Sequence, residues 1–389
     1  MRGFAFIGVI LVLFLYTGFK IGQTVSSWTL AFGLALLIFI VMLSWQFLYR
    51  GHQLDSHSTG FAVVAWSGGI VMGVWAIFVL LSLPVDFGFM LWAGFRRMTS
   101  GASDPSKRAL LTEWIPVAFA GIAGGMGVFG LRETMAGPKI HEKEVPIPNL
   151  ALGLRGLTIV QISDLHVGPT IRKAYVERVV KEAMALKPDL IAVTGDLIDG
   201  EVAELESETA PLAGLQAPLG VFYVTGNHEY YWGAEKWVNH TRKLGFLPLQ
   251  NENRVVEKNG AKLLVAGVND LSSHSFEEGV ASDPKKAAES DHSTDLKLLL
   301  AHRPGSCYEA EKAGFDLQLS GHTHAGQFFP WNFLVAWAHP YYRGLNRHGK
   351  MWVYVNAGTG YWGPPMRLAI PSEITLLRLV EAPLSSRSS

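Results

Sequence analysis

Metal-ligand side chains follow an apolar run at five places between Asp164 and His324. The five blocks are Asp164-Leu165-His166, Gly195-Asp196-Leu197-Ile198-Asp199, Gly226-Asn227-His228-Glu229, His302 and Gly321-His322-Thr323-His324. Carboxylate, amide and imidazole groups, with no thiolate among them, are the ligands expected for two divalent ions of intermediate hardness. Such a pair of ions is typical of phosphate-ester hydrolysis. Each block alone also fits a turn with a hydrogen-bonded polar residue, but five blocks in order favour a metal site.

The donors divide between two ions that share one carboxylate. We expect the first ion to be held by Asp164, His166, Asp196 and His324. We expect the second ion to be held by Asp196, Asn227, His302 and His322. Asp196 can bridge them with its two oxygens, because the ions of such sites lie about 3.5 to 4 Å apart. A hydroxide between the ions would be the nucleophile, since two cations lower the pKa of bound water.

Three side chains beside the ligands are expected to assist the reaction. His228 follows Asn227 but is not needed as a ligand. We therefore expect it to protonate the leaving alkoxide or to stabilise the phosphoryl charge. Asp199 and Glu229 have two interpretations each, because a carboxylate at such a position either orients a ligand imidazole or caps a helix.

The blocks require a sheet whose strand ends meet. Eight continuous apolar runs predict buried strands, at residues 157–162, 190–193, 221–224, 263–268, 296–301, 317–319, 351–355 and 374–379. The spacing of Ile171, Val179 and Ala183 predicts a helix that Pro188 ends, and a second helix is expected at residues 234–244. Strands alternating with helices indicate an α/β domain, in which ligands collect at the carboxyl ends of the strands. All the candidate ligands follow such ends.

The chain is too apolar for a purely soluble enzyme, and the excess of apolar residues lies at its front. Hydrophobic residues make up 49% and charged residues 17% of the 389 residues, and the mean hydropathy is +0.21. Four apolar stretches, at about residues 4–19, 28–48, 61–83 and 110–131, are long enough to span a bilayer. The apolar character continues from Val85 to Phe95, past Pro84, as a kinked extension or an interfacial helix. No acidic residue interrupts the first three stretches, which favours an anchor over a transporter.

The basic residues between these stretches predict the orientation in the membrane. Arg96, Arg97, Lys107 and Arg108 precede the fourth stretch, whereas each of the two earlier loops holds a single Lys or Arg. Loops rich in Lys and Arg stay in the cytoplasm, so four crossings put the remaining chain outside. We expect a multi-pass protein of a bacterial inner (cell) membrane with its catalytic domain extracytoplasmic.

Four parts are expected along the chain. Residues 1–135 form the transmembrane helical region, residues 136–149 a proline-containing linker, residues 150–381 the catalytic domain and residues 382–389 a disordered tail. The net charge of +0 argues against a nucleic-acid partner, which would require a basic surface. The single cysteine, Cys307, excludes a disulfide within the chain.

Taken together, the five blocks resemble the signature of the calcineurin-like metallophosphoesterases, over residues 157–327. The runs at residues 163–166, 320–327 and 358–365 resemble its membrane-associated YkuE/YaeI-type branch. The resemblance implies a four-layer αββα sandwich after the transmembrane helices, and it agrees with the ligand assignment above. It also implies a dinuclear centre of Mn, Fe or Zn and the hydrolysis of phosphate monoesters or diesters.

Two hypotheses about function follow. The first is a membrane-anchored phosphoesterase whose substrate is a lipid-linked or envelope-derived phosphate ester, such as a phospholipid or a nucleotide-lipid. The second is a catalytically silent metal-binding sensor or interaction module at the membrane. His228 disfavours the second, because a protein that only binds metal needs no proton donor beside it.

Aromatic residues gather directly after the last histidine block. They are Phe328, Phe329, Trp331, Phe333, Trp337, Tyr341 and Tyr342. They form either a surface that rests on membrane lipids or a loop that folds its aromatic side chains into the core. Two arginines, Arg303 and Arg367, either hold a second substrate phosphate or form ion pairs at the surface.

Overall fold

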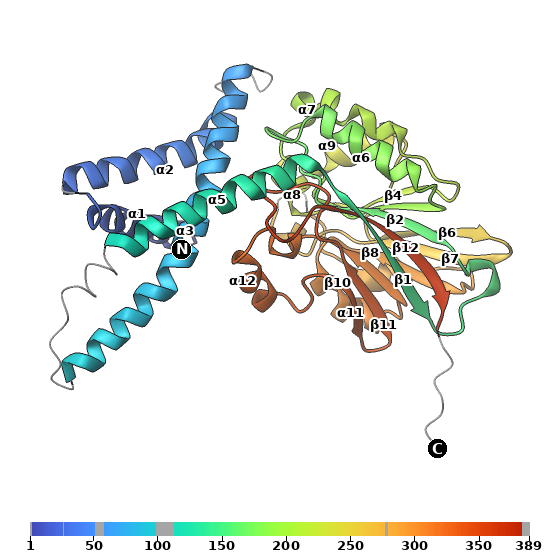
Figure 1. Cartoon of the computed structure of the whole chain (residues 1–389). Coiled ribbons are helices and arrows are strands. Elements are labelled where there is room, and N and C mark those ends of the chain that lie inside the picture. Colours follow the sequence, from blue (N-terminus) through green and yellow to red (C-terminus); the bar gives the residue numbers. More distant parts are fainter. Residues whose placement is uncertain (1, 26, 51–57, 99–112, 277–278, 383–389) are drawn as a thin grey trace. The chain divides into compact units, whose positions relative to one another are not determined.

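The computed structural model describes residues 2–25, 27–50, 58–98, 113–276 and 279–382, without the side chains of residues 2–7, 45–50 and 96–98. The chain forms two compact units (Figure 1). The helical unit comprises Met1–Glu133, Phe329–Trp331 and Gly363–Leu368. The sheet unit comprises Thr134–Phe328, Asn332–Trp362 and Ala369–Ser389. Apart from its first residue, the tail predicted at residues 382–389 lies outside the described residues.

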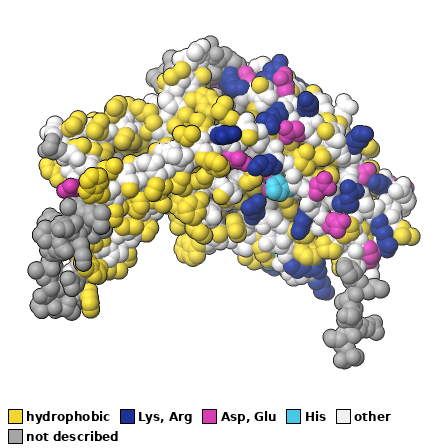
Figure 2. Space-filling model, in the orientation of Figure 1, with side chains coloured by type: hydrophobic (Ala, Val, Ile, Leu, Met, Phe, Trp, Pro, Cys, Tyr) yellow, Lys and Arg dark blue, Asp and Glu magenta, His cyan; other side chains and the backbone are white. Residues whose placement is uncertain are grey.

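Four long helices correspond to the four predicted apolar stretches. They are α1 (Arg2–Gly22), α2 (Trp28–Arg50), α3 (Thr59–Met98) and α5 (Ile115–Ala136). Both α3 and α5 have the length and composition of membrane spans, whereas the apolar parts described in α1 and α2 are shorter. Many apolar side chains of these helices are exposed, and they cover much of the face that Figure 2 shows. Lys107 and Arg108, on which the predicted orientation depends, lie outside the described residues.

The third helix is longer than its predicted apolar stretch. It continues through Pro84 to Met98 as one helix of 40 residues, so the extension interpretation of this segment is correct. The helix therefore includes Asp86, which lies beyond the apolar stretch predicted at residues 61–83. Lys20 Nζ lies 3.0 Å from Asp86 Oδ1, and the hydroxyl of Tyr16 donates to Asp86 Oδ2 at 2.6 Å. The one carboxylate described in α3 is thus paired with α1.

A short segment from near the end of the chain completes the helical unit. Residues Gly363–Leu368 pack against α3 and α5. A side chain at Gly73 of α3 would clash with Met366, and the backbone N–H of Arg367 donates to Gly130 O of α5 at 3.0 Å. Arg367 is fully buried, so the predicted surface position of this arginine is wrong.

The sheet unit contains two six-stranded sheets. The first has the order β1-β12-β2-β3-β4-β5, and the second has the order β10-β11-β9-β8-β7-β6. The strands of the first sheet are β1 (Lys139–Ile147), β12 (Glu373–Glu381), β2 (Thr158–Ile162), β3 (Leu190–Val193), β4 (Val221–Tyr223) and β5 (Leu247–Pro248). Those of the second are β10 (Gly344–His348), β11 (Met351–Val355), β9 (Leu317–Ser320), β8 (Leu296–Leu300), β7 (Ala261–Gly267) and β6 (Glu252–Lys258). The ligand-bearing strands β2, β3 and β4 are parallel, as are β8 and β9.

Alternate strand residues enter different hydrophobic layers. Leu263 and Leu298 lie in the core between the two sheets, whereas Leu264 and Leu299 lie in the core on the outer face of the second sheet. Three helices cover the outer face of the first sheet, namely α6 (Lys173–Ala185), α7 (Val202–Thr209) and α9 (Ala234–Lys243). Two cover the second, namely α10 (Pro284–Ala288) and α11 (Cys307–Lys312). This arrangement confirms the predicted αββα sandwich.

The segment predicted as a linker is mostly a strand. Residues 139–147 form β1, which pairs in parallel with β12 over nine residues. Helix α5 ends at Ala136, so two residues separate this helix from the strand. Strand β1 lies at the edge of its sheet and exposes most of its side chains. Its sequence is therefore rich in charged residues and lacks the continuous apolar run by which other strands were predicted.

Candidate metal centre

The carboxyl ends of five strands carry the seven predicted ligands, and the six Asp and His ligands among them form two groups of facing donor atoms. These strands are β2, β3 and β4 of the first sheet and β8 and β9 of the second. The ligands that follow them are Asp164 with His166, Asp196, Asn227, His302, and His322 with His324. Six of the seven are buried, and His322 is partly buried. Both sheets therefore contribute to one site at the edge of the sandwich.

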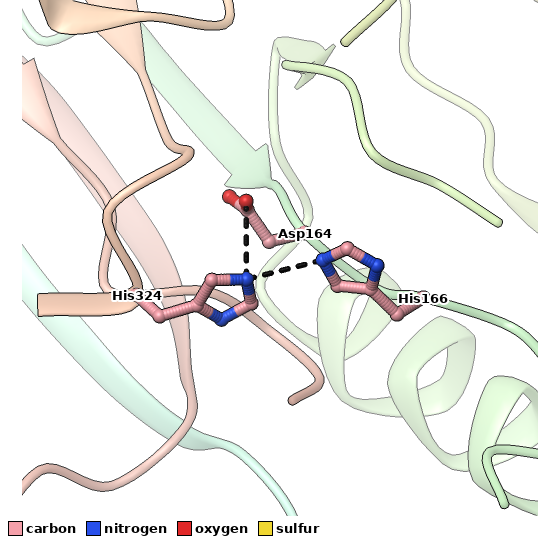
Figure 3. A group of neighbouring side chains, drawn as sticks. All are labelled: Asp164, His166 and His324. Atoms are coloured by element: carbon pink, nitrogen blue, oxygen red, sulfur yellow. Dashed lines mark hydrogen bonds and ion pairs between the residues drawn. The ribbon is translucent and has the colours of Figure 1, made fainter. Parts of the chain in front are cut away.

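The first set of donors consists of Asp164, His166 and His324 (Figure 3). His324 Nε2 lies 3.4 Å from Asp164 Oδ1 and 3.1 Å from His166 Nε2. One ligand atom from each residue lies within 4.8 Å of the others. Two ring nitrogens and a carboxylate oxygen that face one another in this way can share one cation. Apart from Asp196, this is the set predicted for the first ion.

The second set consists of Asp196, His302 and His322. His302 Nε2 lies 3.1 Å from Asp196 Oδ2 and 3.2 Å from His322 Nδ1. Asp196 Oδ2 also lies 3.9 Å from His166 Nε2, so one oxygen faces both sets. The other oxygen, Oδ1, accepts the backbone N–H of His228 at 2.9 Å. Asp196 thus lies between the sets but turns one oxygen toward them, where the sequence suggested two.

These residues fit a pair of divalent cations. His302 Nδ1 donates to Thr194 O at 2.8 Å, which turns its Nε2 toward the other donors. Asn227 Oδ1 is buried and has no hydrogen-bond partner within the described part of the chain. A buried carbonyl is rarely left without a partner, and a cation would satisfy this one. The mixed oxygen and nitrogen donors suit Mn, Fe or Zn.

Most of the ligands sit on a strained backbone. Five of the seven have positive φ angles: Asp164 (52°), His166 (52°), Asp196 (49°), His322 (70°) and His324 (49°). The left-handed conformation costs a residue with a side chain about 1–2 kcal/mol. Such conformations persist where the surrounding structure imposes them, and they concentrate at functional sites. Here they turn the chain sharply at the strand ends, so that neighbouring residues reach the same site.

The carboxylate of Glu229 holds two of the ligand loops together. It accepts the backbone N–H groups of Gly226 at 2.6 Å, Leu197 at 2.7 Å and Asp196 at 3.1 Å. Glu229 therefore caps the short helix α8 (Asn227–Tyr231) and joins it to the loop after β3. For this residue the capping interpretation is correct, and its bonded partners are backbone amides rather than a ligand imidazole.

Asp199 lies between two imidazoles. Its Oδ1 forms a short hydrogen bond with His228 Nδ1, and its Oδ2 lies 3.2 Å from His166 Nδ1. Burial opposes ionisation of Asp199, but the charges of His228 and His166 lower its pKa to about 2. Burial likewise opposes the charged form of His228, but Asp196 and Asp199 raise its pKa to about 9. At neutral pH His228 therefore carries a proton and is held by Asp199.

Asp196 and His302 form a buried pair of opposite charge in the second set. Burial opposes ionisation of Asp196, but His302 and His228 hold its pKa well below the ordinary value. Burial also opposes the charged form of His302, whose pKa Asp196 raises to about 10. Because a ligand imidazole must be neutral, a cation that binds here displaces a proton from His302.

Several neighbours of the site were not predicted. Tyr231 and Trp362 flank His228, with ring-centroid distances of 5.1 Å and 5.7 Å. His339 lies 5.6 Å from His322, measured in the same way. For Trp362 the only signal in the sequence was its place in the glycine-rich run at residues 358–365. His339 stands alone in the sequence, which offered no signal for it.

One of the two arginines considered for phosphate binding lies near the site. Arg303 Nε donates to Asp270 Oδ2 at 2.9 Å, as the ion-pair interpretation predicted. Burial, His302 and Arg303 together hold the pKa of His322 below its ordinary value. The positive charge of Arg303 therefore disfavours protonation of His322, although Arg303 is paired with Asp270.

The glycine of the third block permits a close approach between two ligand loops. A Cβ at Gly226 would clash with Asp196 Oδ1 and with the backbone nitrogen of Asp196. We expect Gly226→Ala to displace Asp196 and to lower activity about a hundredfold, the cost of a misplacement of about 1 Å. Overpacking should also lower the free energy of unfolding by about 1–3 kcal/mol.

The matched control for Gly226→Ala is Gly305→Ala. A Cβ at Gly305 would make an ordinary contact of 3.5 Å with Leu271. Activity and the free energy of unfolding, measured by denaturant titration, should change little in the control. Equal activity of the two variants would contradict the role given to the close approach at Gly226.

Comparisons with known proteins agree with this geometry. The family model described as calcineurin-like phosphoesterase matches residues 157–326. A Bos taurus protein named transmembrane protein with metallophosphoesterase domain is 34% identical over 339 residues, or 83% of this chain and 74% of that protein. An uncharacterized metallophosphoesterase of Helicobacter pylori is 37% identical and covers 71% of this chain and 73% of its own. The uncharacterized metallophosphoesterase YkuE of Bacillus subtilis is 27% identical, covering 70% of this chain and 97% of its own. This chain therefore belongs to the calcineurin-like metallophosphoesterases.

Proposed function

We propose that this protein is a membrane-anchored, dinuclear metal-dependent phosphoesterase that hydrolyses a phosphate monoester or diester. The observation that carries the proposal is the convergence of two donor sets on one oxygen of Asp196. Asp164, His166 and His324 would hold one ion, and Asn227, His302 and His322 the other. When bound, two ions of Mn, Fe or Zn supply Lewis-acid activation of water and neutralise phosphate charge.

His228 performs the acid chemistry in this proposal. Its Nδ1 is engaged by Asp199, so its Nε2 is the nitrogen that can donate a proton. That atom lies 3.9 Å from Asp196 Oδ2, at the border of the donor sets. An imidazolium there can donate to an ester oxygen as its bond to phosphorus breaks. Before that step its charge also attracts the phosphate.

We propose a lipid-linked or envelope-derived phosphate ester as the substrate. The support is the tether: two helices have the length and apolar composition of membrane spans, and the Bos taurus relative is named a transmembrane protein. An enzyme held at the bilayer meets lipid headgroups at high local concentration. We also propose the orientation argued above, with the sheet unit outside the cytoplasm of a bacterial inner membrane.

A substrate panel tests the proposed reaction. The full chain, purified in detergent and loaded separately with Mn, Fe or Zn, is assayed on bis-p-nitrophenyl phosphate, phosphatidyl esters and nucleotide-lipid diphosphates. We expect metal-dependent hydrolysis of the activated diester and faster hydrolysis of at least one lipid ester. Phosphate release and mass spectrometry of the products measure the rates and identify the bond that is cut.

Two outcomes of this panel would count against the proposal. Stoichiometric metal binding without turnover of any ester would support the silent binding module. Hydrolysis that survives removal of the metals by a chelator would place the chemistry elsewhere in the chain.

A further inference from the structure

The helix that follows the last histidine block is apolar on all sides and unburied. Helix α12 spans Trp331–Ala338, and Asn332 is its one polar residue. All eight residues are described, and none of them is buried. Trp337 is 88% exposed and Phe333 is 63% exposed. Among the seven aromatics whose place the sequence left open, only Phe328 is buried, so the core interpretation fails for α12.

The exposed apolar side chains of α12 indicate which kind of partner covers it. A helix that docks on a protein needs one apolar stripe, with a polar face toward water. Helix α12 has no such polar face, so a partner that covers a single stripe would leave the rest exposed. A lipid phase can surround the helix on several sides at once. Large exposed apolar surfaces of this kind mark interaction sites.

Charge supports the same partner. The sequence contains no acidic residue between Asp316 and Glu373. Arg343, Arg347 and Lys350 follow the helix within this interval, and all three are exposed. An apolar aromatic helix followed in the chain by exposed cations matches a bilayer with anionic headgroups.

The chain enters α12 directly from a segment of the helical unit. Phe329–Trp331, which include the first residue of the helix, belong to the compact unit of the apolar helices. Two of those helices are candidate membrane spans. At 1.5 Å per residue, α12 is about 12 Å long. It is too short to cross a hydrocarbon core of about 30 Å, so contact with lipid would place it within the interface.

We propose that α12 is an interfacial helix that inserts Phe333 and Trp337 into the lipid surface. His339 follows directly after the helix, and its ring contacts the candidate ligand His322. A bilayer that holds α12 therefore brings lipid phosphates close to the metal centre. The insertion itself is independent of catalysis, whereas the preference for lipid phosphates rests on the function proposed above.

Depth-dependent quenching tests the insertion. The lone, buried Cys307 is replaced by Ser, and Trp337→Cys or Phe333→Cys in the full chain then carries an environment-sensitive fluorophore. The protein is placed in nanodiscs of phosphatidylcholine and phosphatidylglycerol with brominated acyl chains. We expect quenching and a blue shift at both positions. The control is Leu152→Cys, because Leu152 is an apolar residue of the sheet unit that is 79% exposed.

Quenching at positions 333 and 337 no stronger than at 152 would overturn the insertion. Replacing phosphatidylglycerol by phosphatidylcholine should weaken the quenching, because Arg343, Arg347 and Lys350 then lose their anionic partners. Equal quenching in the neutral bilayer would show that these three cations do not contribute to the insertion.

Kinetics of the double variant Phe333→Ser/Trp337→Ser test the link to the substrate. We expect hydrolysis of a phosphatidyl ester in nanodiscs to fall at least about tenfold, since apolar contact with the bilayer is lost. Hydrolysis of soluble bis-p-nitrophenyl phosphate should not change. An equal loss on both substrates would indicate a distorted site and contradict the link. If the unmodified enzyme hydrolyses neither ester, the proposed function fails, but the quenching experiment still decides the insertion.

Discussion

Replacing Asp196 by Asn should reduce hydrolysis by about a thousandfold or more, since the shared charge of both donor sets is lost. Asp196 Oδ2 faces His166 and His302, whereas Oδ1 accepts the His228 N–H. An Asn side chain can keep the second interaction but not the negative charge of the first. The fold should therefore be retained while the metal content falls. Elemental analysis of the purified variant and its rate on bis-p-nitrophenyl phosphate measure both effects.

Asp316→Asn is the matched control for this variant. Asp316 is a partly buried carboxylate that accepts the backbone N–H of Lys297, at the beginning of β8, away from the carboxyl ends that form the site. Metal content and activity should match those of the unmodified enzyme. An Asp196→Asn enzyme with full activity would refute the central position given to this carboxylate.

Replacing His228 by Gln should have an effect that depends on the leaving group. Burial disfavours the imidazolium, but Asp196 and Asp199 raise the pKa of His228 to about 9, so the proton is present below that pH and is lost as the pH rises through it. General acid catalysis contributes about 10²–10⁴-fold to a rate. We expect this loss for alkyl esters, whose alkoxide needs a proton, and a much smaller one for p-nitrophenyl esters. Steady-state rates on a series of esters of graded leaving-group acidity provide the measurement.

His240→Gln is the control for His228→Gln. His240 is also buried, but its ring contacts Thr209 and Trp237 on the far side of the first sheet. The His240→Gln variant should show the same dependence of the rate on the leaving group as the unmodified enzyme. If His228→Gln slowed all esters by the same factor, its role would be to bind phosphate and not to donate a proton.

The interior of the fold could be predicted from the sequence, but its edges could not. All eight strands expected from continuous apolar runs are present, with ends shifted by two residues at most. The four strands that were missed, β1, β5, β6 and β10, are the edges of the two sheets. A strand buried on both faces leaves an apolar run in the sequence, whereas an exposed edge carries polar residues. In β6, for example, no residue is buried.

The site could be predicted as a set of residues but not as a geometry. The ligand types and their places after strands were enough to predict the six Asp and His side chains that form the two donor sets. The sequence could not show that Glu229 would bind three backbone amides, because its partners include residues about 30 positions earlier. Neither could it place Trp362 beside His228, since that contact depends on a loop more than 100 residues away.

The return of residues Gly363–Leu368 to the helical unit has a practical consequence. The polypeptide leaves the sheet unit after Trp362, places Met366 beside Gly73 of α3, and returns to the sheet unit at Ala369. The helical unit therefore contains residues from near the end of the chain as well as its N-terminal helices. A fragment without the N-terminal helices would expose the apolar side chain of Met366, which packs beside Gly73, and we expect such a fragment to aggregate. Biochemistry on this enzyme is therefore best begun with the intact polypeptide.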